Sequence, residues 1–301
     1  MILTKPVTLD KNENFTGYLF IGPSLIGVFL FSILPLLLSL FFSFTDWNLI
    51  SSISSMNFVG FRNYYEMFSD TVFFTSLKNN FLFAIYTIPV QLSLGLIAAV
   101  LINKKCYGKN VFKAVYFLPY ISSTVAIATV WMFLFQPSFG PVNDILRAIG
   151  FSSPPNWLTD KNWALPSVAA MYSWQNIGYD IIIFIAGLQT IPNELYESSD
   201  IDGANWTNKF RYITLPMVTP TLFFLLITEI MSTFRVFDQI QVLTEGGPGN
   251  ATSVLVYYLY EVSFRYYKIG YGSAITMILF AVIFFITFVQ WKSRDKWVKE
   301  A

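Results

Sequence analysis

The chain has 301 residues, of which 54% are hydrophobic and 12% are charged, against roughly 25% charged residues in a typical soluble domain. It contains no histidine and a single cysteine, Cys106, which excludes histidine general bases, Ser-His-Asp triads, histidine-ligated metals and internal disulfides. With 19 Lys+Arg against 18 Asp+Glu, it lacks the basic surplus of a nucleic-acid-binding protein, and it has no G-x-x-x-x-G-K-[ST] loop for ATP.

Six stretches with one charge or none are long enough to cross a membrane, which takes about 20 mostly apolar residues. The sequence therefore predicts an all-α, polytopic membrane protein with a single transmembrane domain over residues 1–301. The predicted spans are residues 18–42, 79–102, 114–135, 164–188, 216–240 and 269–291. The first span is longer than the apolar core of a cleavable signal, about 7–15 residues, so we expect it to persist as a helix.

Lysine and arginine are unevenly distributed over the predicted loops. Twelve lie on the side that holds both termini and seven lie on the other side. Because positive residues favour the cytoplasm, we expect both termini to be cytoplasmic. On the opposite side, the aromatic-rich residues 252–268 are predicted to form a helix in the membrane interface.

The predicted cytoplasmic loop over residues 189–215 carries the most informative local pattern. Asn193 can cap a helix with Glu197 in its first turns, where the helix dipole favours acids, and Gly203 can end that helix. A second helical stretch is expected over residues 206–212. The apolar residues of the first helix are Leu195, Tyr196 and Ile201. Such a helix–turn–helix fits the groove of a partner protein, and a solvated connector is the alternative.

The fourth and fifth predicted spans each carry a charge within the membrane, where charges are costly and usually functional. Helical spacing places each charge on a polar face. These faces consist of Tyr172, Ser173, Asn176, Tyr179 and Asp180 in the fourth span, and of Glu229, Ser232 and Thr233 in the fifth. The two faces are predicted to line one cavity; the alternative is that they hydrogen-bond neighbouring helices to each other.

Several motifs of this chain resemble one family. Glu197-Ser198-Ser199, then Gly203, then Ile213-Thr214-Leu215-Pro216 are similar to the EAA motif of ABC-importer permeases, with serines in place of its two alanines. Further similar motifs are Phe117-Leu118-Pro119, Trp157-Leu158, Ala186-Gly187-Leu188-Gln189, Phe237-Asp238 and Leu243-Thr244-Glu245-Gly246-Gly247-Pro248-Gly249. From about residue 18 to residue 290, the chain resembles the carbohydrate-uptake branch of maltose and glycerol-phosphate-type permeases.

The resemblance implies a type I ABC-importer permease fold in the bacterial plasma (inner) membrane, and import of a sugar or oligosaccharide by alternating access. It implies three partners besides membrane lipid: a second permease subunit, expected to be a different chain; an ATPase dimer at the cytoplasmic face; and an extracytoplasmic sugar-binding protein. ATP and Mg²⁺ would bind to the ATPase, so we expect neither a cofactor nor a catalytic site on this chain.

The resemblance also implies roles for particular residues. The ATPase contact would consist of Leu195, Tyr196, Glu197, Ser198, Ser199, Asp202 and Gly203. The sugar path would run between the fourth and fifth spans, whose carboxylates, amides and hydroxyls suit sugar hydroxyl groups. Two other functions remain open: a stand-alone secondary transporter, or a membrane-embedded hydrolase that uses Asp180 and Glu229. The EAA-like loop argues against both.

Overall fold

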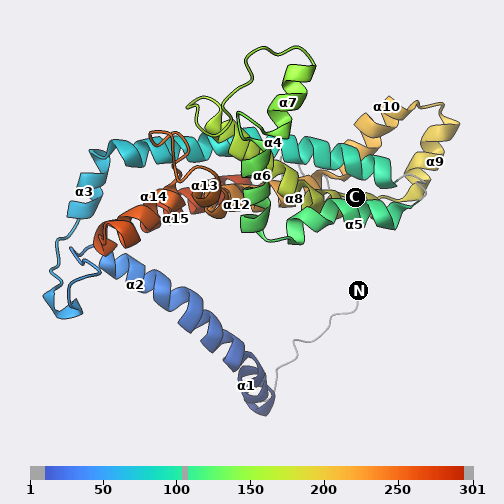
Figure 1. Ribbon diagram of the computed structural model, residues 1–301. Helices are drawn as coiled ribbons and strands as arrows, with labels where there is room; N and C mark the ends of the chain where they lie inside the picture. The colour runs from blue at the N-terminus through green and yellow to red at the C-terminus, as the bar shows by residue number, and fades with distance from the viewer. Residues whose placement is uncertain (1–10, 104–107, 295–301) are drawn as a thin grey trace.

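In the computed structural model, the structure describes residues 11–103 and 108–294, and it is helical over most of them (Figure 1). The helices are α1 (Lys11–Val28), α2 (Leu34–Phe42), α3 (Arg62–Phe68), α4 (Thr71–Asn103), α5 (Lys109–Ile121), α6 (Thr124–Leu134), α7 (Pro141–Ala148), α8 (Ala164–Gln189), α9 (Asn193–Ile201), α10 (Trp206–Lys209), α11 (Leu215–Met217), α12 (Thr219–Phe234), α13 (Asp238–Leu243), α14 (Leu255–Tyr260) and α15 (Ile269–Ser293). Three π-helical turns, Phe29–Ile33, Phe210–Thr214 and Glu261–Arg265, and one 3₁₀ turn, Ile53–Ser55, complete the helical segments.

Helix α8 lies at the centre of the bundle and packs against α4, α5 and α12. Glycines permit this close approach, as small residues do at helix interfaces in membranes. A Cβ atom on Gly178 would lie 1.9 Å from the backbone oxygen of Tyr116 on α5. A Cβ atom on Gly187 would lie 2.1 Å from Oγ1 of Thr221 on α12. The separation of the α5 and α8 backbones thus leaves no room for a side chain at position 178, and a side chain at position 187 would overlap that of Thr221.

Three helical segments are long and apolar enough to cross a membrane: Tyr18–Phe42, Thr71–Asn103 and Ile269–Ser293. Two bent pairs, Asn110–Ile121 with Thr124–Leu134 and Trp206–Met217 with Thr219–Phe234, raise the number to five if each pair is one span. Helix α8 is also long, with 26 residues, but its polar residues reduce its hydropathy. Helices occur at all six predicted positions, and the count of six spans stays a prediction.

The third predicted span, residues 114–135, is not one continuous helix in the structure. The helix breaks after Ile121, and α5 and α6 meet at 94°. Ser122 is extended, with a ψ angle of 155°, and the Ser123 hydroxyl accepts a hydrogen bond from the backbone of Ala126. Serine favours such caps because its side chain competes with the helical backbone for hydrogen bonds. A local cap therefore overrides the apolar pattern.

The fifth predicted span, residues 216–240, also differs from the structure. The helix bends by 61° beside Val218 and ends at Phe234. Pro220 lacks the backbone N–H that a continuous helix would use there, which accounts for a break near this point. A separate short helix, α13, begins at Asp238.

Two further boundaries differ from the predicted ones. Helix α4 begins at Thr71, eight residues before the predicted start, because the Asp70 carboxylate accepts hydrogen bonds from the first backbone N–H groups of α4. The predicted interfacial helix over residues 252–268 is helical only over residues 255–265. Lys78 lies within α4, so a charged residue does not mark the start of this helix.

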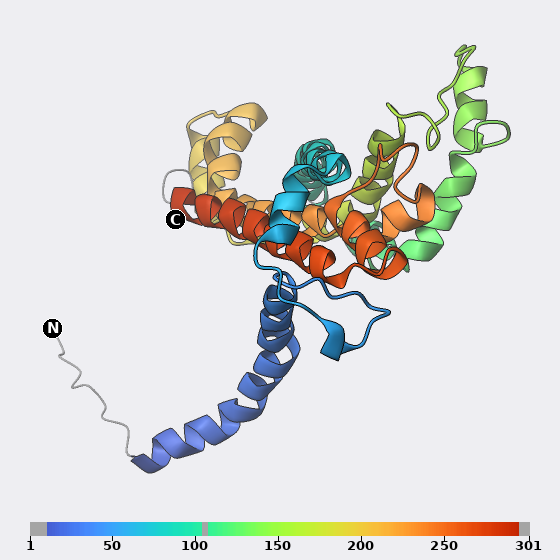
Figure 2. The ribbon, with the colours of Figure 1, turned by 90° about the vertical axis from the view of Figure 1, so that its left-hand side faces the viewer.

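The N-terminal helical arm, α1 and α2, extends away from the bundle (Figures 1 and 2). Its apolar segment Tyr18–Phe42 is 0% buried within the chain, and its attachment to the bundle runs through α2 and α15.

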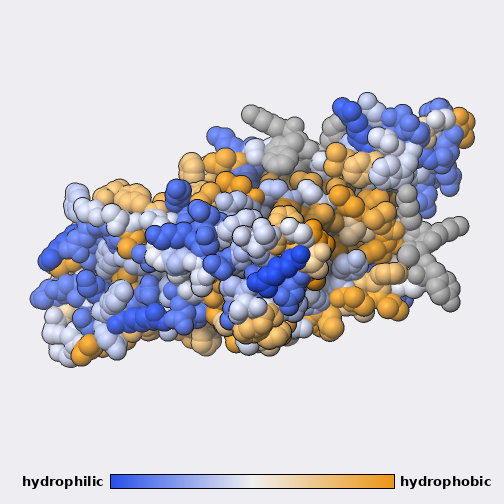
Figure 3. All heavy atoms as spheres, turned by 45° about the horizontal axis from the view of Figure 1, so that its top comes forward, coloured by the Kyte–Doolittle hydropathy of each residue, from blue (hydrophilic) through white to orange (hydrophobic). Residues whose placement is uncertain are grey.

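The ends of the bundle are more polar on their surface than its middle. In Figure 3, apolar side chains gather between a polar area over α9 and α10 and a polar area at the opposite end.

Candidate functional site

A cavity of about 300 Å³ lies between α5, α8 and α12; we call it the chamber. It is lined by Tyr120, Asn176, Tyr179, Thr228, Glu229, Met231, Ser232 and Arg235. The structure therefore brings four of the eight predicted path residues, two from each polar face, together around one cavity. Tyr120 on α5 joins them, although the sequence analysis did not select it.

The chamber presents groups suited to a polyhydroxylated ligand. The rings of Tyr120 and Tyr179 stack with centroids 5.1 Å apart, which forms a flat aromatic wall. The Asn176 amide donates to the backbone oxygen of Tyr172 at 2.8 Å, which fixes the orientation of its side chain. Nε of Arg235 donates to the backbone oxygen of Met231 at 3.1 Å. A small number of polar groups that converge beside an aromatic surface is typical of small-molecule sites.

The other four predicted path residues do not line the chamber. Tyr172 is buried and packs edge-on against Phe83 at 5.2 Å. Thr233 is buried, and its hydroxyl donates to the backbone oxygen of Ile230 at 3.1 Å. Both side chains therefore lie within the bundle rather than in the chamber wall. Asp180 is buried beside Glu229, which itself reaches the chamber.

The prediction that Ser173 shares the face of Asn176 was wrong. Ser173 lines a separate, mostly apolar groove of about 660 Å³ between α4, α5 and α8, together with Trp174 and Ile177. One residue along a helix rotates the side chain by about 100°, so Ser173 points away from its neighbour Tyr172.

Gln91, on α4, is the polar residue that the sequence analysis missed beside this site. It is 0% exposed and interacts with Glu229. A neutral amide in an uncharged span gives a weaker signal than a charge does. Its spacing from the buried Thr87 and Asn80, four and eleven residues before it, would have indicated a polar face on α4.

The candidate coupling loop, residues 189–215, projects from one end of the bundle and carries α9 and α10 (Figure 1). Gly203 follows α9, which agrees with the prediction that it ends this helix, and it has a φ angle of +73°. No atom lies within 4 Å of a Cβ built on Gly203. The need for glycine is therefore conformational rather than a matter of space.

Several residues of α9 face solvent, as an external contact requires. Ile201 is 87% exposed and Leu195 is 39% exposed, and Glu197, Ser198 and Asp202 are exposed as well. The Ser198 and Ser199 hydroxyls donate to the backbone oxygens of Leu195 and Tyr196, respectively. These two small residues of the EAA-like motif are therefore bonded within their own helix.

Two expectations about α9 were wrong. Tyr196 does not project outward: its hydroxyl bonds to Oγ1 of Thr214 at 2.9 Å, and its ring packs against the bundle. Asn193 is the first residue of α9 rather than its cap, and Pro192 occupies the cap position without a side-chain hydrogen bond. Pro192 fixes the backbone entry to the helix, and Tyr196 anchors α9 to the segment that leads into α12.

An ion pair between Lys209 and Asp200 joins α10 to α9. Asn205 caps α10 by accepting a hydrogen bond from the backbone of Asn208 at 2.9 Å. The rings of Trp206 and Phe210 stack with centroids 5.6 Å apart. These contacts, together with the Tyr196 anchor, tie α9 and α10 to each other and to the bundle.

Comparison with known proteins decides the family. Residues 91–293 match the family described as "Binding-protein-dependent transport system inner membrane component". The chain belongs to this family. It is a multi-pass inner-membrane permease subunit of an ABC importer, and thus a transport component rather than an enzyme.

Relatives cover nearly the whole permease. The lactose transport system permease protein LacF of Rhizobium radiobacter is 31% identical over 296 residues, with 96% of this chain and 97% of the relative covered. The arabinooligosaccharides transport system permease protein AraP of Bacillus subtilis (strain 168) is 34% identical over 287 residues, with 94% and 90% covered. A chain of a bacterial alginate ABC transporter, solved in complex with an alginate pentasaccharide-bound periplasmic protein, superposes with a TM-score of 0.84 at 22% identity, covering 99% of this chain and 100% of that one. The permease therefore has the ABC-importer permease fold.

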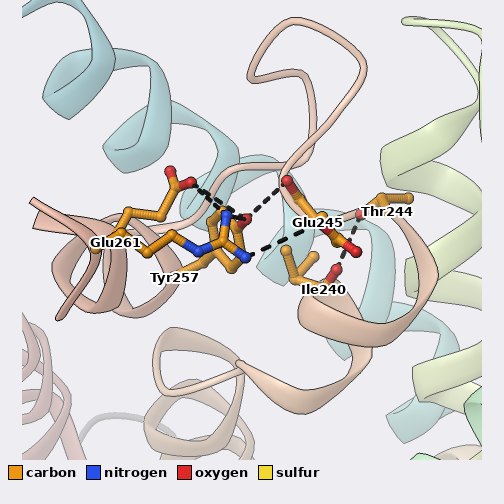
Figure 4. A network of polar contacts seen from close by, with 6 residues as sticks. Ile240, Thr244, Glu245, Tyr257 and Glu261 are labelled. Atoms are coloured by element: carbon orange, nitrogen blue, oxygen red, sulfur yellow. Dashed lines mark hydrogen bonds and ion pairs between the residues drawn. The ribbon is translucent and has the colours of Figure 1, made fainter.

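At the end of the permease opposite to α9 and α10, a polar network fixes the loop that follows α13 (Figure 4). The Tyr257 hydroxyl donates to the backbone oxygen of Glu245 at 2.8 Å. Arg265 donates to Oε1 of Glu261 at 3.1 Å and lies 3.9 Å from the Glu245 carboxylate. Burial, and then the Glu261 carboxylate, raise the pKa of Tyr257 to about 12, so this hydroxyl stays protonated at physiological pH. The loop is held at both its backbone and its side chains.

Asp70 forms a second junction at this end of the permease. Its Oδ2 accepts hydrogen bonds from the hydroxyls of Tyr258 and Tyr271, the latter at 2.6 Å, while Oδ1 caps α4. Burial alone would raise the pKa of Asp70, but these hydrogen bonds outweigh it and lower the pKa below 3.8. One carboxylate therefore ties α4 to α14 and α15.

Replacing Asp70 by asparagine is expected to weaken this junction by about 1–3 kcal/mol, because two partly buried tyrosine hydroxyls lose a charged acceptor. Since the pKa of Asp70 is lowered in the folded state, its stabilisation is present above the unfolded pKa and is lost as pH falls through the folded pKa. Thermal unfolding in detergent should therefore show a lower melting temperature for Asp70→Asn at pH 7, and a smaller difference near pH 3. A constant difference at both pH values would contradict the charged-acceptor role.

Proposed function

We propose that this permease subunit carries a sugar or oligosaccharide across the membrane by alternating access, driven by ATP hydrolysis on partner ATPase subunits. The observation that carries the proposal is the chamber, where the Tyr120–Tyr179 stack lies beside Asn176 and Ser232. Aromatic faces pack against sugar C–H groups, and amide and hydroxyl groups exchange hydrogen bonds with sugar hydroxyls. The names of the relatives, which refer to lactose and arabinooligosaccharides, support the same class of substrate.

The proposed path uses four of the eight path residues that the sequence predicted, together with Tyr120. Asn176, Tyr179, Glu229 and Ser232 would contact the substrate, with Tyr120 as a fifth contact. Of the remaining predicted path residues, Tyr172, Asp180 and Thr233 would support these contacts from behind, whereas Ser173 lines a separate groove.

We further propose that α9 docks into a cleft of the ATPase dimer, with Leu195, Glu197 and Ile201 at the contact. The exposure of these side chains and the rigid attachment of α9 by Tyr196 support this role. A second permease, expected to be a different chain, would complete the path. An extracytoplasmic sugar-binding protein would deliver the substrate from the opposite side.

The proposed orientation places α9, α10 and the end of α15 in the cytoplasm. These elements lie at the same end of the permease (Figure 2), and this end collects Lys209, Arg211, Lys292 and Arg294. A reporter that is active only in the cytoplasm should therefore be active when fused after Trp291. Activity of a periplasm-specific reporter at that position would overturn the orientation.

Asn176→Leu is expected to reduce oligosaccharide uptake at least tenfold while complex assembly and ATP hydrolysis persist. A tenfold reduction in the transport rate corresponds to about 1.4 kcal/mol of activation free energy. Loss of one polar contact that strengthens during translocation is expected to cost at least this much. The measurement is uptake of a labelled oligosaccharide, with ATPase activity of the purified complex in parallel. Thr276→Val is the matched control, because its hydroxyl bonds within α15 at 3.0 Å and does not line the chamber. Normal uptake by Asn176→Leu would return this residue to a packing role.

A further inference from the structure

Three polar side chains meet inside the bundle behind the chamber: Gln91 on α4, Asp180 on α8 and Glu229 on α12. They are 0%, 0% and 4% exposed. Asp180 interacts with Glu229, and Glu229 interacts with Gln91. Gly95 allows this approach, since a Cβ atom there would lie 3.0 Å from Cβ of Asp180. Three helices thus bring two carboxyl groups and one amide group together inside the bundle.

Most polar atoms of this cluster lack a regular hydrogen bond among the described residues. The buried atoms without one are Oδ1 and Oδ2 of Asp180, Oε2 of Glu229, and Oε1 and Nε2 of Gln91. Four of these five atoms are acceptors, and only the Gln91 amide nitrogen is a donor. Buried polar groups are normally hydrogen-bonded, so the cluster is short of donors.

Among the described residues, one positive charge lies near the cluster, that of Arg235, and no ion pair joins it to either carboxylate. Helix α12 contributes Arg235, whose Nε is engaged by the backbone of Met231. The other titratable groups that face the cluster are tyrosines, namely Tyr172 and Tyr179 on α8 and Tyr120 on α5. The nearest lysine of α4, Lys78, lies thirteen residues before Gln91, and the middle of α15 carries no charge.

We propose that Gln91, Asp180 and Glu229 form a binding site for one proton, which the two carboxyl groups share. Two like charges this close in a low-dielectric region cannot both persist. One proton removes a negative charge and at the same time adds the missing donor. The Gln91 amide then donates to the remaining carboxylate, so that α4, α8 and α12 are joined through one hydrogen-bonded group.

The site is connected to the substrate path through Glu229, which lines the chamber while Asp180 lies behind it. A proton can therefore enter or leave through the chamber. Loss of the proton places two carboxylates against each other and pushes α8 from α12, the two helices that carry the substrate contacts. The proton site would hold the chamber in shape, whichever substrate the permease carries.

Infrared difference spectroscopy of the purified, assembled importer tests this inference directly. At pH 7, the wild-type protein should show the carbonyl band of a protonated carboxyl group, shifted in D₂O. That band should be lost in both Asp180→Asn and Glu229→Gln, because either amide replaces the shared proton. Asp144→Asn, at an exposed acid of α7, should leave the band unchanged.

A second measurement does not depend on infrared assignment. The melting temperature of the wild-type importer should fall by a few degrees more than that of Asp180→Asn when the pH is raised from 7 to 9.5. Absence of the band at pH 7, its persistence in both variants, or equal pH responses would overturn the proton site. Stabilisation by sodium rather than by protons would also contradict it. Failure of substrate uptake alone would concern the proposed function and not this site.

Discussion

Replacing Gly178 by alanine is expected to remove most of the folded permease from the membrane. The added Cβ atom would lie 1.9 Å from the oxygen and 2.7 Å from the carbon of the Tyr116 carbonyl. Because both atoms belong to the backbone of α5, no side-chain rotation relieves the overlap, and α5 must move from α8. The cost should exceed the ~1–3 kcal/mol that is typical of overpacked cores.

The amount of monodisperse protein after detergent extraction, measured by size-exclusion chromatography, tests this expectation. Gly27→Ala is the matched control: it adds the same methyl group to a membrane helix, but no atom lies within 4 Å of the added Cβ. It should extract like the wild type. Equal recovery of Gly178→Ala would show that α5 and α8 do not approach as the structure has them.

Glu197→Lys and Gly203→Val are expected to abolish uptake while leaving the membrane bundle folded. Reversal of the exposed Glu197 charge would cost about 2–5 kcal/mol at a partly buried contact with a basic partner residue. Valine at Gly203 must adopt a φ angle of +73°, which costs roughly 1–2 kcal/mol and more for a β-branched residue, or else the end of α9 must rearrange. Both variants should release the ATPase more readily in a quantitative pull-down.

Gly60→Val provides a sharp control for the second variant. Gly60 also has a positive φ angle, +58°, and no atom within 4 Å of a built Cβ, but it precedes α3 at the other end of the bundle. It therefore introduces similar strain without altering α9, and it should keep the ATPase bound. Retention of the ATPase and normal uptake by both loop variants would make α9 a connector and contradict its coupling role.

The parts of the fold that follow from composition and period could be predicted. Long uncharged stretches indicated an all-helical membrane protein, and the polar faces around Asp180 and Glu229 indicated two helices that border one cavity. The end of the first loop helix at Gly203 was also indicated by the sequence, and glycine suits the positive φ angle found there. These features depend on local chemistry that one sequence displays.

The parts that failed depend on competition between local and tertiary forces. The hydropathy of residues 114–135 does not reveal that Ser123 caps a new helix at 94° to the preceding one. Nor does the helical period reveal which apolar or polar side chain faces the bundle. Ser173 lines a different groove, and the Tyr196 hydroxyl bonds to Thr214 within the chain. The packing of neighbouring helices, which the sequence period does not show, determines which side of a helix is buried.

Reconstitution of the full importer in proteoliposomes tests the central claim most directly. The permease, its partner permease and the ATPases are placed in vesicles, with the sugar-binding protein and a labelled oligosaccharide outside and ATP and Mg²⁺ on the ATPase side. Accumulation of the label should require both ATP and the binding protein, persist when ionophores collapse the ion gradients, and fail with Asn176→Leu. Accumulation that runs on an ion gradient without ATP would contradict the account and identify a secondary transporter.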